Sequence, residues 1–526
     1  MQQKMDLEKT FYTLQNGNDV RGVAVESDLG PVTLTPSLAA FIASSFADYV
    51  AKVAGKERKQ LRIGVGHDSR MSADAMMEGC KKGLSDATVY DCGLCSTPSM
   101  FQSTIYPESG FDGSIMLTAS HLPFNRNGMK FFTPEGGLEH DALTGVLKEA
   151  IALAEKYGEA DEKEIISAKN LPVGEGKVEP FALTDVYADH MRQYIIDQVK
   201  AEDEAHPLQG LHIVLDAGNG AAGFFAEKIL APLGADISGS VFLDPDGTFP
   251  NHVPNPENGA AMDAIRKATL EAKADLGVIF DCDGDRGAVV FSDGMEVNRN
   301  RLIALLSKIV AKDYPGSTVV TDSVTSDELR EFLEDKLGLV HLRYQRGYKN
   351  VINKGIECNQ KGEVCQLAIE TSGHGAFKDN YFSDDGAYIS IKIICEMAKL
   401  RREGKSLESL LEGFTEPAEA MEKRYLIMNP QEGDEDQRDF KAYGKQVIED
   451  FEAFAKKNGY KVVSPNYEGV RVSFDDEEVK GWILVRQSLH DPEIPVNIES
   501  KREGGLAVIL SRMEPFFGEY GRLRAK

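Results

Sequence analysis

The chain has 526 residues, of which 42% are hydrophobic and 27% are charged, and its formal net charge is -25. This charge argues against a broad nucleic-acid-binding surface, which needs clustered lysine and arginine, and no apolar run approaches the ~20 residues that span a bilayer. We therefore expect a cytoplasmic protein without nucleic-acid or membrane partners. At ~150 residues per domain, the length predicts three or four domains.

Predicted strands and helices alternate through the first three quarters of the chain. Hydrophobic strands are predicted at 61–66, 114–118, 211–216, 276–281 and 318–322. Apolar residues at helical spacing separate them, as at 71–84, and strands joined by helices indicate parallel sheets with helices on both faces. Ligands of such sheets gather beyond the carboxyl ends of the strands. Towards the C-terminus, strands at 469–474 and 481–485 indicate an antiparallel α+β layout.

These patterns predict an α/β protein with three similar domains, whose sheets are mainly parallel, and a smaller α+β domain at the C-terminus. The predicted domain boundaries are 1–182, 183–300, 301–420 and 421–526. Two of the predicted strand ends carry the residues that bear on function.

The first of these strand ends leads from Thr118 into Ala119-Ser120-His121, and Asn127-Gly128-Met129-Lys130 follows. A serine is a weak nucleophile, but a phosphoserine is a phosphoryl donor when its oxygens share a metal ion and face cationic groups. Lys130, which we expect a turn at Asn127-Gly128 to hold close, is a candidate for proton transfer or charge neutralisation. His121 could form a hydrogen bond with phosphate. Taken alone, the stretch is more typical of a surface loop without chemistry.

The second strand end carries Asp281, Asp283 and Asp285. If the chain stays extended, alternate side chains point to one side and the three carboxylates converge. Neighbouring carboxylates raise one another's pKa unless a cation neutralises them, and hard oxygen ligands suit Mg²⁺. The alternative is an acidic turn exposed to solvent. Together with Ser120, a metal cluster here would form a phosphoryl-transfer site.

The motifs resemble those of the α-D-phosphohexomutase superfamily, which includes phosphoglucomutases and phosphomannomutases. Thr118-Ala119-Ser120-His121-x-Pro123 with Asn127-Gly128-x-Lys130 is similar to its phosphoserine loop, and Asp281-x-Asp283-Gly284-Asp285-Arg286 to its metal loop. Further motifs follow the family's order across nearly the whole chain: Asp19-Val20-Arg21-Gly22, Asp68-Ser69-Arg70, Asp216-Ala217-Gly218-Asn219-Gly220, Glu370-Thr371-Ser372-Gly373-His374 and Arg486-Gln487-Ser488.

The resemblance implies a hexose-phosphate mutase, an isomerase that interconverts 1-phosphates and 6-phosphates of glucose or mannose, with its four domains around a central cleft. Phosphorylated Ser120 would donate its phosphate to a sugar monophosphate, and the other phosphate of the resulting bisphosphate would return to Ser120. A sugar bisphosphate of the glucose 1,6-bisphosphate type would be the activator. The implied cofactor is Mg²⁺, held by Ser120, Asp281, Asp283 and Asp285.

The resemblance also implies individual roles. The implied catalytic residues are Ser120, Lys130, Arg21 and His121. Lys130 would act as general acid and base, and Arg21 would support charge at the reacting phosphate. The implied substrate-binding residues are Arg286, Lys349, Glu370, Ser372, Arg486, Ser488 and His490.

The last of these motifs, which begins at Arg486, departs from the family's usual pattern. That pattern is Arg-x-Ser-Gly-Thr-Glu-Pro, followed three residues later by another arginine. Here Leu489-His490-Asp491 replaces the central residues, and Pro495 stands at the second arginine's place. Glycine permits close approach to a phosphate and arginine forms a bidentate clamp, so we expect a changed site for the distal phosphate, with His490 or Lys501 as possible compensation. In addition, Arg346-Gly347-Tyr348-Lys349 occupies a loop where some members carry a proton-transferring histidine.

Three alternatives remain open at this point. A phosphoglucosamine mutase has a similar phosphoserine loop. A haloacid-dehalogenase-type phosphatase would use Asp281 as nucleophile and Asp283 as acid and base, and would not need Ser120. A non-catalytic sugar-phosphate-binding protein would need no phosphoryl donor.

Overall fold

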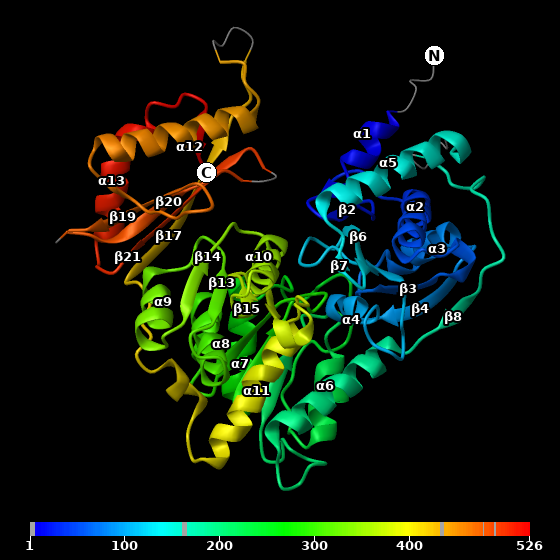
Figure 1. Ribbon diagram of the computed structural model, residues 1–526, viewed down its shortest axis with the longest axis horizontal. Helices are drawn as coiled ribbons and strands as arrows, with labels where there is room; N and C mark the ends of the chain where they lie inside the picture. The colour runs from blue at the N-terminus through cyan, green and yellow to red at the C-terminus, as the bar shows by residue number, and fades with distance from the viewer. Residues whose placement is uncertain (1–5, 160–165, 432–435, 477, 489–490) are drawn as a thin grey trace. The chain divides into compact units, whose positions relative to one another are not determined.

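The structure is a computed structural model that describes residues 6–159, 166–431, 436–476, 478–488 and 491–526 (Figure 1). It divides into two compact units, which we describe separately. The first comprises Met1–Asn298, Ser372–Gly375 and Ser383–Leu407, and the second comprises Arg299–Thr371, Ala376–Phe382 and Glu408–Lys526.

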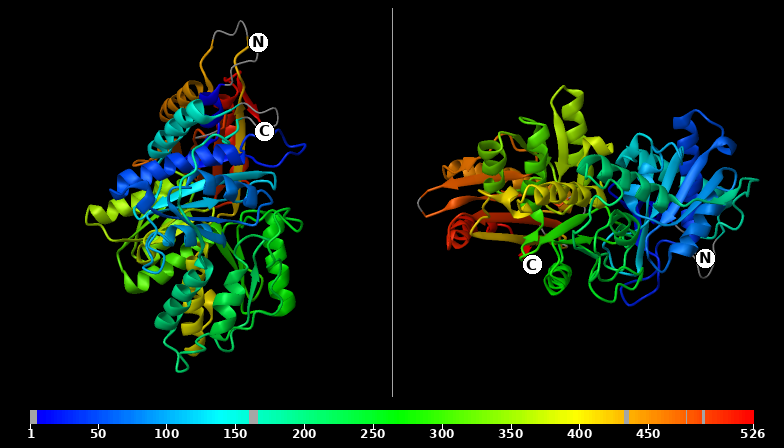
Figure 2. Two further views of the ribbon diagram at one scale, coloured as in Figure 1. Left: turned by 90° about the vertical axis from the view of Figure 1, so that its right-hand side faces the viewer. Right: turned by 90° about the horizontal axis from the view of Figure 1, so that it is seen from below.

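The first unit begins with a mixed sheet of order β1-β2-β6-β5-β3-β4-β8, with β7 paired to β6. Its strands are β1 Gln15–Asn16, β2 Asp19–Val23, β3 Arg62–His67, β4 Thr88–Leu94, β5 Gly113–Leu117, β6 Arg126–Thr133, β7 Gly136–Gly137 and β8 Val178–Pro180. Strand β3 pairs in parallel with β4 and β5, whereas β6 runs antiparallel to β5 and β2. The paired strands lie side by side in both views of Figure 2.

Helices cover both faces of this sheet. They are α1 Leu7–Tyr12, α2 Pro36–Ala54, α3 Ala73–Gly83, α4 Thr97–Gln102, α5 His140–Tyr157 and α6 Leu183–Val199. Ile115 and Leu117 of β5 face a core shared with α2, α3 and α5, whereas Met116 faces a smaller cluster with Met100 of α4 and Leu183 of α6. Successive side chains of a strand point to opposite faces, so both faces of β5 are buried.

Helix α2 is long and apolar enough to span a membrane, but 61% of its most apolar 18-residue stretch is buried inside the protein. Its apolar residues form part of the first core, among them Phe41, Ile42 and Phe46. This burial is what a core helix requires.

The first unit also contains a four-stranded sheet of order β12-β11-β10-β9. Its strands are β9 Ile213–Asp216, β10 Leu276–Phe280, β11 Gly287–Phe291 and β12 Glu296–Val297, and its helices are α7 Gly259–Ala272 and α11 Gly386–Arg402. Strands β9 and β10 are parallel, but β10 and β11 form an antiparallel hairpin. The sequence patterns did not predict this hairpin, because they indicated no strand between 276–281 and 318–322.

The second unit contains a sheet of order β14-β13-β15-β16, in which β13 pairs in parallel with β14 and β15. Its strands are β13 Thr318–Thr321, β14 Val340–Arg343, β15 Cys365–Ile369 and β16 Gly375–Phe377, and its helices are α8 Arg299–Asp313, α9 Asp327–Glu331 and α10 Tyr348–Gln360. Val320, Val351 and Ala368 contribute to its core.

The second unit ends in a sheet of order β18-β19-β20-β21-β17-β22, whose pairs are antiparallel. Its elements are β17 Glu419–Ile427, α12 Phe440–Lys457, β18 Lys461–Val462, β19 Val470–Asp475, β20 Lys480–Val485, β21 Glu493–Ser500, α13 Gly505–Phe517 and β22 Leu523–Ala525. Helices α12 and α13 share one core with this sheet, where Phe451 and Phe516 contact each other edge to face.

The predicted fold class is thus confirmed, with the correction that the sheets are mixed. The predicted strands at 61–66, 114–118 and 318–322 are shifted by one residue or less at either end. The antiparallel pairing predicted near the C-terminus is also present, between β19 and β20.

The face of the C-terminal sheet opposite α12 and α13 carries a buried ionic cluster. The Arg471 guanidinium lies 3.6 Å from the centre of the Trp482 ring and donates to Asp327 at 3.0 Å. The Trp482 Nε1–H donates to Glu499 at 3.0 Å. Burial raises the pKa of Glu499 to about 8, although the Arg471 charge opposes this shift.

We predict that Glu499 makes the protein less stable as the pH rises from about 4.5 to 8. In this range the folded protein retains a proton on Glu499 that the unfolded chain releases, so the free energy of unfolding falls by up to ~1.4 kcal/mol per pH unit. Glu499→Gln keeps an acceptor for the Trp482 N–H. The free energy of unfolding of this variant should fall less steeply with pH, so that it is more stable than the wild type near pH 8. Urea unfolding followed by fluorescence of Trp482, the one tryptophan in the sequence, tests this.

The control for this prediction is Glu514→Gln, which changes the same charge at an exposed position of α13. Its unfolding curves should follow those of the wild type at every pH. If the free energy of unfolding changed with pH in the same way in Glu499→Gln and in the wild type, the prediction would be wrong.

Candidate active site

The serine loop is held in place by buried side chains beyond the end of β5. The Thr118 hydroxyl donates to Asp68 at 2.7 Å and accepts from the Ser120 backbone N–H at 2.8 Å. The buried Arg70 guanidinium donates to backbone carbonyls of the loop, those of Ser120, Leu122, Pro123 and Arg126. Ser120 has φ of 50°, a left-handed conformation that costs energy for a residue other than glycine. The Asp68-Ser69-Arg70 motif therefore fixes the backbone that presents Ser120.

The Ser120 hydroxyl lies between a carboxylate and a cation. It donates to Asp281 Oδ2 at 3.0 Å and accepts from Arg286 Nη2 at 3.1 Å. The residue is only 7% exposed. The two sequence motifs, which are far apart in the chain, thus meet at one oxygen atom.

The three aspartates converge, but not for the reason that the sequence suggested. The chain does not stay extended after β10; it turns back into β11, with Gly284 at φ of 73° and an Asp281 N–H to Arg286 carbonyl hydrogen bond of 3.2 Å. The turn brings carboxylate oxygens of Asp281, Asp283 and Asp285 within 4.8 Å of one another. Convergence therefore depends on the β10–β11 hairpin.

The cluster fits a divalent cation. The buried Oδ1 atoms of Asp283 and Asp285 have no hydrogen-bond partner among the described residues, and an orphaned buried carboxylate oxygen is costly. Burial and the charges of its two neighbours raise the pKa of Asp281 well above its usual value. A hard cation bound to these oxygens would satisfy the two Oδ1 atoms and would offset the repulsion that raises the pKa of Asp281.

Lys130 is positioned by a strand rather than by the expected turn. Asn127 and Gly128 lie within β6, and Lys130 is opposite Met116 of β5. Its ammonium group donates to Asp283 at 2.9 Å and Asp285 at 2.5 Å. Burial opposes the charge, but these two carboxylates outweigh it and raise the pKa of Lys130 well above its usual value. Lys130 is therefore an ammonium ion in this arrangement.

Arg21 lies on β2, opposite Gly128 of β6. Its guanidinium donates to Asp19 at 2.8 Å and to the Thr118 carbonyl. A side chain at Gly128 would collide with it, since a Cβ there would lie 2.9 Å from Arg21 Cδ. Gly128 thus leaves the space through which Arg21 reaches the serine loop.

His121 is a neutral hydrogen-bonding group in this structure. Burial, followed by the positive charges of Arg286 and His374, lowers the pKa of His121 to about 3. The guanidinium of Arg286 donates to its Nδ1, so the proton of the neutral ring is on Nε2. His121 can donate one hydrogen bond to a phosphate oxygen.

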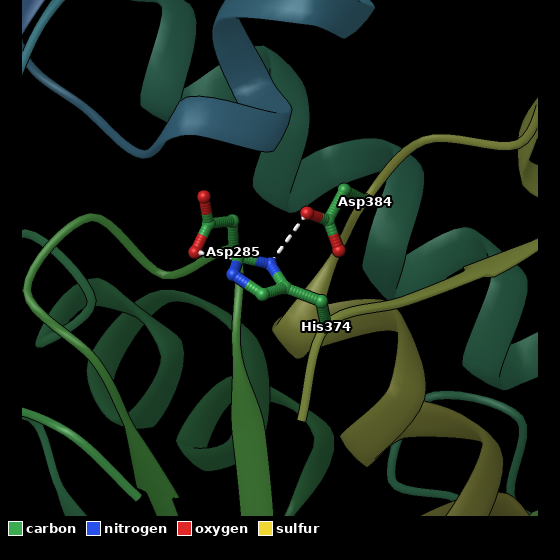
Figure 3. Close-up of side chains that lie close together, drawn as sticks. All are labelled: Asp285, His374 and Asp384. Atoms are coloured by element: carbon green, nitrogen blue, oxygen red, sulfur yellow. Dashed lines mark hydrogen bonds and ion pairs between the residues drawn. The ribbon is translucent and has the colours of Figure 1, made fainter. Parts of the chain in front are cut away.

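The predictions from sequence assigned no role to His374 and Asp384, which also belong to this site. His374 pairs with Arg286 in an isolated antiparallel bridge, and its Nδ1 lies 2.6 Å from Asp384 and 3.7 Å from Asp285, between the two carboxylates (Figure 3). Burial would lower the pKa of His374, but Asp384 and Asp285 raise it to about 9. The sequence contained a signal for His374, which closes the sugar-loop motif, but none for Asp384.

The other predicted substrate-binding residues fall in both units. Ser372 is buried in the first unit, two residues before His374. In the second unit, the Glu370 carboxylate accepts a hydrogen bond of 2.6 Å from the N–H of Gly347, the residue that precedes α10. Lys349 lies in the first turn of this helix. Arg486 follows β20, and the Ser488 hydroxyl accepts from the Asp491 N–H at 3.2 Å.

Two proposals for the altered last loop have different outcomes. His490 lies outside the described residues. The Lys501 ammonium donates to both oxygens of Glu331 at 2.7 Å, so its charge is already balanced within the second unit.

Comparisons with known proteins identify the family. Three models of phosphoglucomutase/phosphomannomutase α/β/α domains match the chain in order: domain I at residues 13–157, domain II at 185–294 and domain III at 298–417. A phosphoglucomutase of Neisseria gonorrhoeae is 28% identical over 94% of this chain and 95% of its own. Phosphohexose mutases of Xanthomonas campestris are 30% identical over 66% of this chain and 71% of theirs.

A solved structure gives the same result. A phosphoglucomutase/phosphomannomutase family protein from Burkholderia thailandensis has a TM-score of 0.74 and 26% identity, and the match covers 97% of this chain and 98% of that one. The chain belongs to the phosphoglucomutase/phosphomannomutase family of the α-D-phosphohexomutase superfamily. It is a hexose-phosphate mutase, an isomerase. The comparisons do not favour the phosphatase, the non-catalytic binding protein or the phosphoglucosamine mutase.

Proposed function

We propose that this mutase acts on glucose and mannose phosphates through a phosphorylated Ser120. The observation that supports this most is the position of the Ser120 hydroxyl, between Asp281 Oδ2 at 3.0 Å and Arg286 Nη2 at 3.1 Å. A phosphate on this oxygen would lie beside a buried guanidinium and the carboxylate cluster, as a phosphoryl donor requires.

The proposed residue roles follow from the charges. The P–O bond to Ser120 breaks as a sugar hydroxyl bonds to phosphorus. The Lys130 ammonium donates a proton to the departing serine oxygen, and the resulting amine takes the proton of the sugar hydroxyl. Arg286 and the Nε2–H of His121 hold the transferring group, and Arg21 supports its charge from the side of Thr118. In the return half-reaction the Ser120 oxygen bonds to the other phosphorus as the sugar P–O bond breaks, and Lys130 donates a proton to the departing sugar oxygen and takes the proton of the serine hydroxyl.

We propose that Asp281, Asp283, Asp285 and the phosphoserine hold Mg²⁺. The orphaned Oδ1 atoms of Asp283 and Asp285 support this proposal. A related fold points the same way: an N-acetylphosphoglucosamine mutase of Aspergillus fumigatus, with 13% identity and a TM-score of 0.52, was solved in complex with GlcNAc-6P and magnesium. When bound, the ion would stabilise the negative charge of the transferring phosphoryl group.

Peptide mass spectrometry of Ser120 tests the proposed function. The purified protein is incubated with MgCl₂ and glucose 1,6-bisphosphate and then, after desalting, with glucose 1-phosphate, mannose 1-phosphate or glucosamine 1-phosphate. We expect phosphate on Ser120 that glucose and mannose phosphates discharge rapidly. An unmodified Ser120 in folded protein would contradict the phosphoserine proposal, and selective discharge by the glucosamine phosphate would reassign the substrate.

A further inference from the structure

The carboxylate cluster presents two oxygens that no other described residue engages. These are the buried Oδ1 atoms of Asp283 and Asp285. Both oxygens of Asp281 accept hydrogen bonds, Oδ1 from the Arg286 N–H at 3.2 Å and Oδ2 from the Ser120 hydroxyl at 3.0 Å. The cluster therefore offers a cation one open oxygen on Asp283 and one on Asp285.

A threonine outside the two sequence motifs engages the other oxygen of Asp283. The Thr97 hydroxyl donates to Asp283 Oδ2 at 2.5 Å, and the Thr97 backbone N–H donates to the Asp283 carbonyl at 2.8 Å. Thr97 is only 5% exposed, and both residues belong to the first unit. One hydrogen bond to the backbone and one to the carboxylate together fix the position of Asp283 and the rotation of its carboxylate group.

The chain around Thr97 is held by the first sheet. Thr97 is the first residue of α4, shortly after the end of β4. The N–H of Cys95 donates to the carbonyl of His67, the last residue of β3, at 3.0 Å. Met100 of α4 packs in the core cluster on one face of this sheet. The hydroxyl that orients Asp283 therefore has a fixed origin, outside the hairpin that carries the carboxylates.

Lys130 contacts the same oxygen, but its charge changes during the proposed reaction. Its ammonium group donates to Oδ2 of Asp283 at 2.9 Å and to Oδ2 of Asp285 at 2.5 Å. In the proposed mechanism Lys130 gives up a proton and takes one back in each half-reaction, and a neutral amine binds a carboxylate less strongly than an ammonium ion does. The Thr97 hydroxyl takes no part in these transfers, so it can hold Asp283 Oδ2 at every step.

We propose that Thr97 is a positioning residue that keeps Asp283 Oδ2 occupied, so that Asp283 binds the metal ion through Oδ1 alone, and that this selects Mg²⁺ over Ca²⁺. This inference rests on the proposed magnesium site. Mg²⁺ requires a near-ideal octahedron of ligands at short distances, whereas Ca²⁺ accepts more ligands and carboxylates that bind through both oxygens. A carboxylate with one open oxygen suits the first ion better than the second.

Isothermal titration of the unphosphorylated protein with MgCl₂ and, separately, with CaCl₂ tests this without turnover. Thr97→Val keeps the backbone N–H and the size of the side chain but loses the hydroxyl. We expect the affinity for Mg²⁺ to fall at least about tenfold, as for loss of a residue that orients a metal ligand, and the affinity for Ca²⁺ to fall less than about threefold. Thr97→Ser, which retains the hydroxyl, should keep the wild-type ratio of the two affinities.

The control is Thr104→Val, which removes a buried hydroxyl of the same unit that donates to the Phe101 carbonyl at 2.8 Å. This variant should bind both ions as the wild type does. Thr97→Ala removes the same hydroxyl as Thr97→Val without a second methyl group, and it provides the measurement if the valine variant does not fold. Melting temperatures without metal show which variants are folded.

The outcomes separate the inference from the proposed function. Wild-type affinity for Mg²⁺ in folded Thr97→Val or Thr97→Ala overturns the inference. Equal losses of Mg²⁺ and Ca²⁺ affinity also overturn it, because a general disturbance of the cluster would not distinguish the two ions. Failure of the wild-type protein to bind Mg²⁺ would overturn the magnesium site and the inference together, whereas the phosphorylation of Ser120 is measured independently by mass spectrometry.

Discussion

Replacing Ser120 with alanine should reduce mutase turnover by at least about 10⁴-fold, because removing the group that carries the covalent intermediate removes the reaction path itself. The fold should be unaffected, since the Ser120 hydroxyl contacts side chains only and the loop is held by Thr118 and Arg70. The measurement is the coupled conversion of glucose 1-phosphate to glucose 6-phosphate.

The control is Ser238→Ala, which removes an exposed hydroxyl elsewhere in the first unit. Its turnover and melting temperature should equal those of the wild type. Substantial mutase activity in Ser120→Ala, with no phosphorylated serine, would mean that another residue carries the phosphate and that the proposed role of Ser120 is wrong.

Replacing Asp285 with asparagine should reduce turnover by about 10²- to 10³-fold, because a metal ion that stabilises phosphoryl charge contributes several kcal/mol. The amide keeps the size of the side chain but removes one negative charge from the cluster that we propose as the magnesium site. The concentration of Mg²⁺ at half-maximal activity should rise at least about tenfold.

A thermal-shift titration measures metal binding without activity. Mg²⁺ should raise the melting temperature of the wild type, since a ligand of the folded state stabilises it, and should have little effect on Asp285→Asn. Asp293→Asn, a substitution in the exposed turn after β11, should respond to Mg²⁺ as the wild type does. An unchanged response in Asp285→Asn would exclude this carboxylate as a ligand.

Much of the site was predictable from the sequence because its chemistry lies in contiguous motifs. Ser120 and the three aspartates follow predicted hydrophobic strands, and the carboxyl ends of β5 and β10 are where such residues are expected. The two motifs together suggested a phosphoserine and a metal cluster, although the serine stretch alone did not. It did not predict that the Ser120 hydroxyl contacts both Asp281 and Arg286.

The mechanisms that position these residues were predicted less well. The sequence suggested an extended segment for the aspartates and a turn for Lys130, whereas the structure has a hairpin turn for the first and strand β6 for the second. Alternation of polar and apolar residues does not distinguish a strand that continues from one that reverses. Hydrogen bonds with neighbouring strands decide between them.

The sequence by itself determined the alternation of strands and helices and the motifs in their order. Only the tertiary structure placed Asp384 against His374 and the Ser120 hydroxyl against Asp281 and Arg286. These pairs join loops that are separate in the chain, and no local pattern encodes which loops meet. The packing of sheets and helices sets those distances, and with them the pKa values, the ion pairs and the sites open to a ligand.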